Sequence, residues 1–412
     1  MWEMGTGMVV ILPLVILYVL RCIFVFCFDL RMRLHFIRTR FNDELVRRCP
    51  ALSRTYRPHF GMTCIPGIDY FLQTAKTDTP LLVKRATLRL QKVELPGGGT
   101  LGLQWLNDYI RIDTAKTTPI VISFPPVGSC SPYGSLSGAL CHEVSAKLGY
   151  RVVQVVYQGL GGLPLTSKQL PSSAYCGLSD SGEAIRSVHA AYPDAKIMIL
   201  GCSIGSAIFT RWAGCNPEKC KEYNVIGCVN CGHGFSVQET TECGDATHWG
   251  FPGKRVVGIW KGQLQDTSSE YLIGLDGVDG FSTQALLDAK MSAQWDEAVM
   301  PLYGYANRED MFLKCDAVHV LQDLCIPSLF VNAEDDPVCP AARMRRKEKP
   351  VLLNHPMVLL LSTQRGGHLG WHDGYFVSQR RWIRDVVCEY FRALVEVDES
   401  SDLINANGLT PQ

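Results

Sequence analysis

Short apolar runs alternate with longer helical segments through the middle of the chain, and this pattern constrains the fold more than any other feature. Pro119 to Phe124, Arg151 to Tyr157 and Lys196 to Cys202 are rich in aliphatic and β-branched residues. The segments between them, Tyr133 to Leu148 and Asp180 to Tyr192, have helical character. Continuous apolar strands joined by crossover helices are typical of a parallel sheet covered on both faces. The sequence therefore predicts a mostly parallel, doubly wound α/β domain.

The alternation continues toward the C-terminus and is preceded by a hairpin. Three further strands are expected at Asn224 to Val229, Pro327 to Asn332 and Met357 to Ser362. A closing amphipathic helix is expected from Phe376 to about Val395. Strand signals begin near Ala86, in an alternating segment that the turn Pro96 to Gly99 joins to a second arm at Leu101 to Leu106.

One long stretch without strand signals interrupts this order. Residues 232–324 contain several helical segments, of which Thr283 to Val299 is the most regular. Doubly wound sheets bind ligands at the carboxyl ends of their strands, and an insertion of this length is commonly functional. We therefore expect an α/β domain over 81–400 with an inserted helical cap over about 232–324, followed by a C-terminal tail over 401–412.

An apolar run of membrane-spanning length, Met8 to Phe28, lies near the N-terminus and is interrupted only by Pro13 and Arg21. Four arginines follow it within residues 31–40, whereas the segment before it has neither lysine nor arginine. The positive-inside tendency then places the C-terminal side in the cytosol. The sequence predicts an N-terminal transmembrane helix with a basic flank over 1–40, a connector over 41–80, and a single-pass membrane protein with a cytosolic catalytic domain. A cleaved signal peptide and an interfacial helix are the alternatives.

The segment Gly201-Cys202-Ser203-Ile204-Gly205 carries the strongest chemical signal in the chain. It fits the pattern Gly-x-Ser-x-Gly, which is weak evidence by itself. Here it directly follows a predicted buried strand and opens a predicted helix from Ile204 to Ala213. A nucleophilic serine on a sharp turn requires this strand-turn-helix setting, because the turn projects the hydroxyl out of the sheet. The sequence therefore predicts Ser203 as a nucleophile.

A serine hydroxyl needs a base to accept its proton, and the base needs an acid to orient it. His368 and Asp336 follow Ser203 in the chain order Ser, Asp, His, and each lies just after a predicted strand. Asp336 is favoured over the adjacent Asp335 because it is the turn residue immediately before Pro337. The more distant alternates are Glu334 and His372.

The negative charge that develops on the attacked carbonyl requires hydrogen-bond donors next to the nucleophile. The backbone N–H of Ile204, the residue after the nucleophile, is the first expected donor. The second should come from the loop Phe124 to Ser129. Because Pro125 and Pro126 have no N–H group, Val127 is the expected second donor, with Gly128 next.

The net charge of the chain and the spacing of its cysteines bear on whether it binds nucleic acid or a metal. Forty basic and forty acidic residues give zero formal net charge, which excludes the basic footprint of a nucleic-acid-binding protein. Cys228 and Cys231 have a metal-ligand spacing, but they fall on and just after a predicted buried strand, where cysteine is a small apolar residue. We therefore expect no metal, no cofactor and no nucleic acid, and the sequence identifies no protein partner.

Several motifs together resemble the type-four subfamily of membrane-anchored α/β-hydrolase-domain lipases and esterases. They are the apolar run, Arg57-Pro58-His59-Phe60, Gly149 to Val153, Gly159 to Thr166, the Ser203 turn, Asn332 to Pro337 and Gly366 to Gly370. The resemblance covers most of the chain. It implies the α/β-hydrolase fold and a carboxylic ester hydrolase whose triad is Ser203, Asp336 and His368. A lipid ester of the acylglycerol or phospholipid type is the implied substrate.

Two segments depart from the family pattern. Pro125-Pro126 stand where the family has a glycine in the oxyanion loop, and Val156-Tyr157-Gln158-Gly159 stand where it has an Asn-x-Arg-Gly segment. A non-catalytic membrane ligand-binding protein is therefore one alternative. An acyltransferase on the same fold is another, because His368 and Asp373 have the His-x4-Asp spacing of such enzymes.

Overall fold

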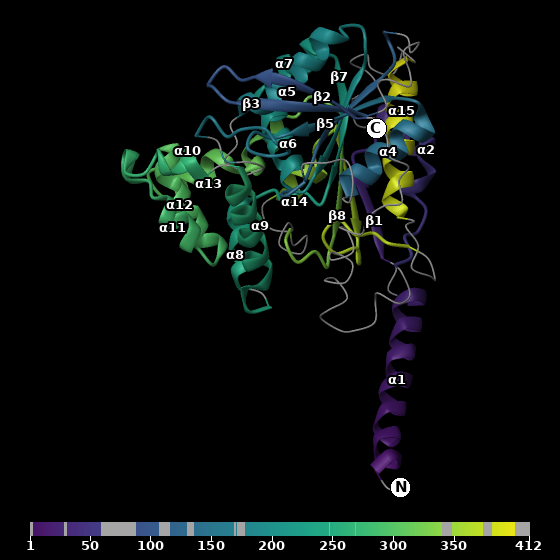
Figure 1. Cartoon of the computed structure of the whole chain (residues 1–412). Coiled ribbons are helices and arrows are strands. Elements are labelled where there is room, and N and C mark those ends of the chain that lie inside the picture. The colour runs from purple at the N-terminus through teal and green to yellow at the C-terminus, as the bar shows by residue number, and fades with distance from the viewer. Residues whose placement is uncertain are drawn as a thin grey trace.

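A nine-stranded sheet forms the centre of the molecule. The structure, a computed structural model, describes residues 3–28, 31–58, 88–106, 116–129, 136–168, 170, 178–246, 248–267, 269–339, 348–373 and 381–399. Its strands are β1 (Met32–Phe36), β2 (Leu88–Glu94), β3 (Thr100–Leu106), β4 (Ile120–Phe124), β5 (Arg151–Val156), β6 (Ile197–Cys202), β7 (Val225–Cys231), β8 (Ser328–Ala333) and β9 (Val358–Thr363). They lie in the order β1-β9-β8-β7-β6-β4-β5-β3-β2 (Figure 1).

The middle of this sheet is parallel and its edges are antiparallel. Strands β5, β4, β6, β7, β8 and β9 pair in parallel, whereas β3 joins β5, β2 joins β3, and β1 joins β9 in antiparallel register. The parallel strands are continuous apolar runs, and all six residues of β6 are buried, because helices cover both faces. The prediction of a mostly parallel α/β-hydrolase sheet is thus confirmed.

Alternate residues of each central strand enter two different cores. In β4, Ile120 and Ile122 face one hydrophobic cluster and Val121 faces the other. The first cluster includes residues of α5 (Leu178–Ala191) and α6 (Ile204–Cys215), and the second includes residues of α2 (Arg40–Arg48), α4 (Leu136–Leu148) and α15 (Trp382–Glu399). The shorter helices are η1 (Pro50–Leu52), α7 (Pro217–Glu222) and α14 (Glu348–Leu353). Because helices pack on both faces of the sheet, the strands and the loops at their ends are held in place.

The strand β1 corrects the expectation that strands begin near Ala86. It forms within the predicted basic flank and pairs with β9, from Met32 opposite Thr363 to Phe36 opposite Leu359. Met32, Leu34 and Phe36 pack against the core, while Arg33 and His35 occupy the alternate positions. This alternation of apolar and basic residues is the two-residue period of a half-buried strand, although it falls within the segment assigned to the basic flank. The helix α2 next to it also packs on α15, so this part of the N-terminal region belongs to the domain.

A group of helices is inserted between β7 and β8. They are α8 (Val237–Ala246), η4 (His248–Gly250), α9 (Phe251–Thr267), α10 (Ser269–Ile273), η5 (Val278–Gly280), α11 (Thr283–Asp288), α12 (Ser292–Tyr303), α13 (Arg308–Cys315) and η6 (Ala317–Asp323). We call α8 through α13 the cap. It has its own hydrophobic core, which includes Trp295, Val299 and Met311, and Figure 1 shows it as a lobe beside the sheet.

The single helix expected from Thr283 to Val299 is two helices, α11 and α12. The carboxylate of Asp245, at the end of α8, accepts hydrogen bonds from the backbone N–H groups of Ser292 at 3.0 Å and Ala293 at 2.8 Å. A side-chain acceptor at these positions satisfies the free donors of a helix start. A new helix therefore begins at Ser292 because of a contact with Asp245, which lies more than forty residues earlier in the sequence.

The N-terminal apolar run forms the helix α1 (Glu3–Phe28), which projects away from the sheet (Figure 1). Its large apolar side chains between Ile11 and Phe24 are 40–63% exposed. Among the helices that the structure describes, none combines the length and the apolar character needed to cross a membrane. The transmembrane anchor and its orientation therefore stay predictions, and the predicted tail 401–412 lies outside the described residues.

Candidate active site

Ser203 lies on the sharp turn between β6 and α6, where the sequence predicts it. Its backbone has φ 53° and ψ −123°, in the region of positive φ that a residue with a side chain rarely adopts. The turn is held on both sides, because the N–H of Ser203 donates to the carbonyl of Cys231 at 2.8 Å and its own carbonyl accepts from the N–H of Ser206 at 3.0 Å. The strand, turn and helix required around a nucleophilic serine are present.

The two glycines of the motif are explained by close backbone approach. A Cβ atom at Gly201 would lie 2.5 Å from the Cα of Ser206. A Cβ atom at Gly205 would overlap the carbonyl oxygen of Phe124, at the end of β4. Because neither neighbour is a flexible side-chain end, both positions require glycine, and α6 can start directly against the end of β4.

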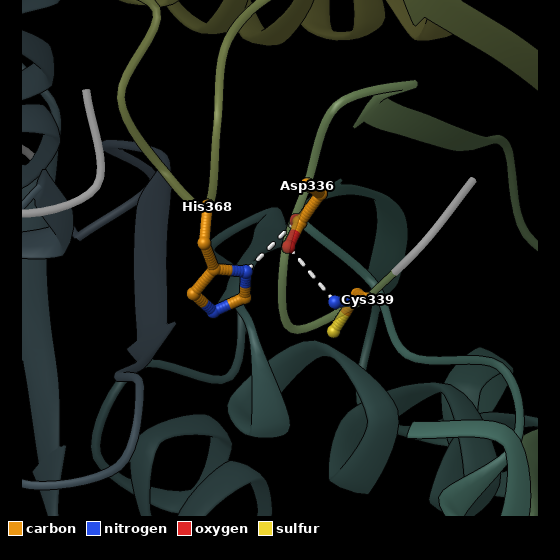
Figure 2. Close-up of side chains that lie close together, drawn as sticks. All are labelled: Asp336, Cys339 and His368. Atoms are coloured by element: carbon orange, nitrogen blue, oxygen red, sulfur yellow. Dashed lines mark hydrogen bonds and ion pairs between the residues drawn. The ribbon is translucent and has the colours of Figure 1, made fainter. Parts of the chain in front are cut away.

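The structure brings the three predicted triad residues together. The Oγ atom of Ser203 lies 2.8 Å from Nε2 of His368, and Nδ1 of His368 lies 2.8 Å from Oδ2 of Asp336. Figure 2 shows the contact between the imidazole and the carboxylate. The three side chains are buried and follow β6, β9 and β8, whose carboxyl ends meet at one edge of the sheet. This is the geometry in which a histidine takes the proton of a serine.

The structure also separates Asp336 from Asp335. Oδ1 of Asp336 accepts hydrogen bonds from the backbone N–H groups of Val338 and Cys339, each at 2.8 Å, which leaves Oδ2 toward His368. Oδ1 of Asp335 instead accepts from the backbone N–H of Gly367 at 2.8 Å. Asp335 therefore ties the loop after β8 to the loop of His368, while Asp336 contacts the imidazole itself.

The other alternates are engaged elsewhere through their backbones. The N–H of Glu334 donates to the carbonyl of Thr363 on β9 at 2.7 Å. The carbonyl of His372 accepts from the hydroxyl of Tyr56 at 2.9 Å. Asp373, the acid of the His-x4-Asp spacing, forms an isolated backbone bridge with Pro58. The acid that contacts the His368 imidazole is Asp336, so the geometry does not support a functional pair of His368 and Asp373.

The two expected oxyanion donors lie beside the nucleophile. Val127 and Ile204 line the same pocket as Ser203. Neither of their backbone N–H groups has a hydrogen-bond partner within the described parts of the chain. Free N–H groups next to a nucleophile are what the stabilisation of an oxyanion requires.

The pocket in front of Ser203 extends under the cap. Its volume is about 790 Å³, including the open mouth. The wall on the sheet side comes from the loop after β4, from α6 and from the loop after β8, and the opposite wall comes from α8, α9 and α12. Most of the lining side chains are apolar, with polar groups at a few positions, as is common for pockets that bind small organic ligands.

A metal is a poor fit to the one three-ligand cluster found in the described residues. Ligand atoms of Asp336, Cys339 and His368 lie within 4.8 Å of one another (Figure 2). Burial, together with the nearby Asp336 carboxylate, raises the pKa of the Cys339 thiol well above its ordinary value. A neutral thiol is a weak metal ligand, and Asp336 and His368 already bind each other. Cys228, of the Cys-x2-Cys pair, instead contacts the hydroxyl of Ser328 at 3.2 Å.

Sequence reasoning missed the cap residues of the pocket. Ser292, Asp296 and Trp260 line it, and no motif marks them. The placement of Ser292 and Asp296 depends on the restart of α12 at Ser292, where Asp245 of α8 binds the backbone N–H, while Trp260 lies on α9. A helical pattern alone gives no signal of this kind.

Comparison with known proteins gives sequence relatives over most of the chain. No protein-family model matches. The phospholipase ABHD3 of Bos taurus is 23% identical over 365 residues, which cover 86% of this chain and 82% of the relative. The monoacylglycerol lipase ABHD2 of Danio rerio is 25% identical over 379 residues, or 88% of this chain and 83% of the relative. The monoacylglycerol lipase of Saccharomyces cerevisiae is 22% identical over 308 residues, or 73% of this chain and 63% of the relative.

Solved structures of esterases resemble the chain at lower sequence identity. An esterase from Pyrobaculum calidifontis has a TM-score of 0.43 and 13% identity, and the match covers 81% of this chain and 88% of that one. The esterase Pf2001 of Pyrococcus furiosus has a TM-score of 0.39 and 14% identity, with 69% and 83% covered. The sheet order described above, rather than these scores, identifies the fold.

Proposed function

Because this chain belongs to the α/β-hydrolase superfamily, we propose that it is a serine hydrolase that cleaves carboxylic esters of lipids. The observation that carries the proposal is the hydrogen-bonded chain Ser203–His368–Asp336, whose serine lines a largely apolar pocket. The names of the relatives, phospholipase and monoacylglycerol lipase, support a lipid ester as the substrate. The proposed substrate is a lipid ester of the acylglycerol or phospholipid type.

The proposed reaction has two halves with an acyl-enzyme between them. The Oγ of Ser203 bonds to the ester carbonyl carbon while Nε2 of His368 takes the Ser203 proton. The backbone N–H groups of Val127 and Ile204 bind the oxyanion that forms. The carbon–oxygen bond then breaks, and His368 returns the proton to the leaving alcohol. In the second half His368 takes a proton from water as the water oxygen bonds to the acyl carbon. The bond between that carbon and the Oγ of Ser203 then breaks, the acid is released, and His368 returns the proton to Ser203.

Asp336 sets the protonation state that this reaction needs. A carboxylate 2.8 Å from Nδ1 holds the imidazole proton on that nitrogen. The lone pair of Nε2 then faces the Ser203 hydroxyl. The two backbone N–H groups on Oδ1 keep the carboxylate in this orientation.

We expect the purified full chain to release free fatty acid from long-chain monoacylglycerol or lysophospholipid in detergent micelles, with one alcohol formed for each acid. Mass spectrometry of both products measures this directly. Ligand binding without release of either product would favour the alternative of a non-catalytic binding protein. Transfer of the acyl group to an added alcohol in place of water would favour an acyltransferase.

We further propose that α1 attaches this enzyme to a lipid bilayer. The large apolar side chains of α1 between Ile11 and Phe24 are exposed, and burial in lipid would remove them from water. A second exposed apolar group lies at the junction of α8 and α9, where Trp249 is 94% and Phe251 49% exposed. In Figure 1 this junction is at the end of the cap that points the same way as α1. Both surfaces would then meet one lipid surface.

Deletion of residues 1–29 should release the protein from membranes that retain the full chain after carbonate washing, and esterase activity should persist. The cut leaves β1 in place, which preserves the edge of the sheet. Sedimentation and fatty-acid release measure the two outcomes.

A deletion of residues 1–40 is the matched control. It also removes β1, so it exposes β9 as a free edge strand, and it should lower the thermal midpoint and promote aggregation. Retention of the 1–29 deletion in the washed membranes would contradict attachment through α1. In the full chain, a C-terminal tag that added protease cannot reach in sealed microsomes would contradict the predicted cytosolic orientation.

A further inference from the structure

Besides Thr240, three polar side chains interrupt the apolar wall of the pocket on its cap side. Ser292 and Asp296 are one helical turn apart on α12, so they lie on the same face of that helix. Thr241 comes from α8, the neighbouring cap helix. All three line the pocket that contains Ser203, and they are 5%, 1% and 6% exposed, respectively.

Asp296 is a carboxylate buried in an otherwise apolar region. Its Oδ2 accepts a hydrogen bond from the Thr241 hydroxyl at 3.2 Å and lies 3.9 Å from a guanidinium nitrogen of Arg308. The guanidinium of Arg308 places a positive charge beside the carboxylate. Contact between a buried carboxylate and hydrocarbon costs free energy. Because Arg308 already supplies one cation, a neutral hydrogen-bond donor is the better ligand for Asp296.

Ser292 supplies an unused hydroxyl beside it. The backbone N–H of Ser292 is bound by Asp245, which fixes the residue at the first turn of α12. Its side-chain hydroxyl has no hydrogen-bond partner within the described residues. Trp260, stacked on Trp295 at 5.1 Å between ring centroids, lines the pocket as well, and its indole N–H is buried without a partner in the described structure.

We propose, on the basis of the function proposed above, that Ser292 and Asp296 form a subsite for the alcohol part of the substrate, which must carry at least one free hydroxyl beside the ester. The substrate hydroxyl would donate to the Asp296 carboxylate, and Ser292 would exchange a hydrogen bond with the same or a neighbouring oxygen. An acyl chain placed here would leave the Ser292 hydroxyl without a hydrogen bond and would put hydrocarbon against the buried Asp296 carboxylate. A site built to bind hydroxyls discriminates strongly against ligands that lack them.

Binding of non-hydrolysable ethers tests this subsite. A long-chain 1-O-alkylglycerol has two free hydroxyls, and the alkyl methyl ether of the same chain length has none. Isothermal titration of the full chain in detergent should give about tenfold or greater preference for the alkylglycerol, the size expected for one net hydrogen bond to a charged group. Ser292→Ala and Asp296→Asn should each reduce that preference about 5- to 10-fold, with the affinity for the methyl ether unchanged.

Thr240→Val is the matched control. Thr240 also lines the pocket, but its hydroxyl already donates to the carbonyl of Ser236 at 2.9 Å, so its loss should leave the preference intact. Circular dichroism melting confirms that each variant is folded, and Asp296→Asn keeps the shape of the side chain it replaces.

Equal binding of the two ethers by the unaltered protein would overturn the proposal, as would an equal loss of affinity for both in the Ser292→Ala and Asp296→Asn variants. Tighter binding of an alkyl quaternary ammonium than of the alkylglycerol would also overturn it, because the subsite would then be cationic in its preference. Since ether binding requires no cleavage, these results are independent of hydrolysis. A protein that prefers the alkylglycerol but releases no fatty acid would refute the proposed function and leave the subsite standing.

Discussion

Ser203→Ala is expected to abolish ester hydrolysis and labelling by a fluorophosphonate probe while the protein stays folded. The loss in kcat should be about 10⁶-fold, as for removal of the nucleophile in other serine hydrolases. The fold should survive because Ser203 holds its turn through its backbone N–H and carbonyl, which alanine retains. Fatty-acid release and gel fluorescence of the probe measure both effects.

Ser206→Ala is the control for this variant. Ser206 is buried three residues away on α6, and its hydroxyl donates to the Ser203 carbonyl. Its loss removes one hydrogen bond near the turn, so we expect a modest loss of stability, about 1 kcal/mol, and retained labelling. Full labelling of the Ser203→Ala protein would show that another side chain is the nucleophile.

Asp336→Asn is expected to lower kcat by about 10⁴-fold with little effect on stability. The two backbone N–H groups of Val338 and Cys339 would hold the amide oxygen in the place of Oδ1. The amide NH₂ group would then face Nδ1 of His368 and force the imidazole proton onto Nε2. With its proton on Nε2, the histidine cannot accept one from Ser203. Steady-state kinetics on a monoacylglycerol give the loss.

The adjacent Asp335→Asn variant separates two effects of Asp336→Asn, the changed orientation of the imidazole proton and the loss of one negative charge. The side chain of Asp335 accepts from the N–H of Gly367, a role that an asparagine oxygen also fills, so kcat should fall less than about tenfold. Both variants remove one negative charge from the same loop. A larger loss in Asp335→Asn than in Asp336→Asn would exchange the roles of the two residues and contradict the geometry described here.

Features fixed by local backbone chemistry could be predicted from the sequence. The turn at Ser203 could be recognised because a glycine stands two residues before it and two residues after it, where other backbone approaches closely, and because an apolar strand precedes it. The parallel sheet is recognisable because strands buried on both faces are continuous apolar runs. The positions of Asp336 and His368 follow from the ends of two such strands.

Features fixed by distant contacts could not be predicted. The strand β1 is stabilised by pairing with β9, more than three hundred residues later, and its short alternation of apolar and basic residues also fits the basic flank of an apolar run. The start of α12 depends on Asp245, so the place of Ser292 in the pocket has no local signature. The sequence favours Asp336 over Asp335 but does not fully separate them, because one residue of shift in a turn decides which carboxylate reaches His368.

The most direct test of the proposed mechanism is to locate the covalent adduct of a fluorophosphonate probe on the full chain by peptide mass spectrometry. The account predicts one modified residue, Ser203, in the wild-type protein, with labelling strongly slowed in Asp336→Asn. An adduct on Ser206, Ser292 or another side chain, or no adduct on a folded protein that still releases fatty acid, would contradict it.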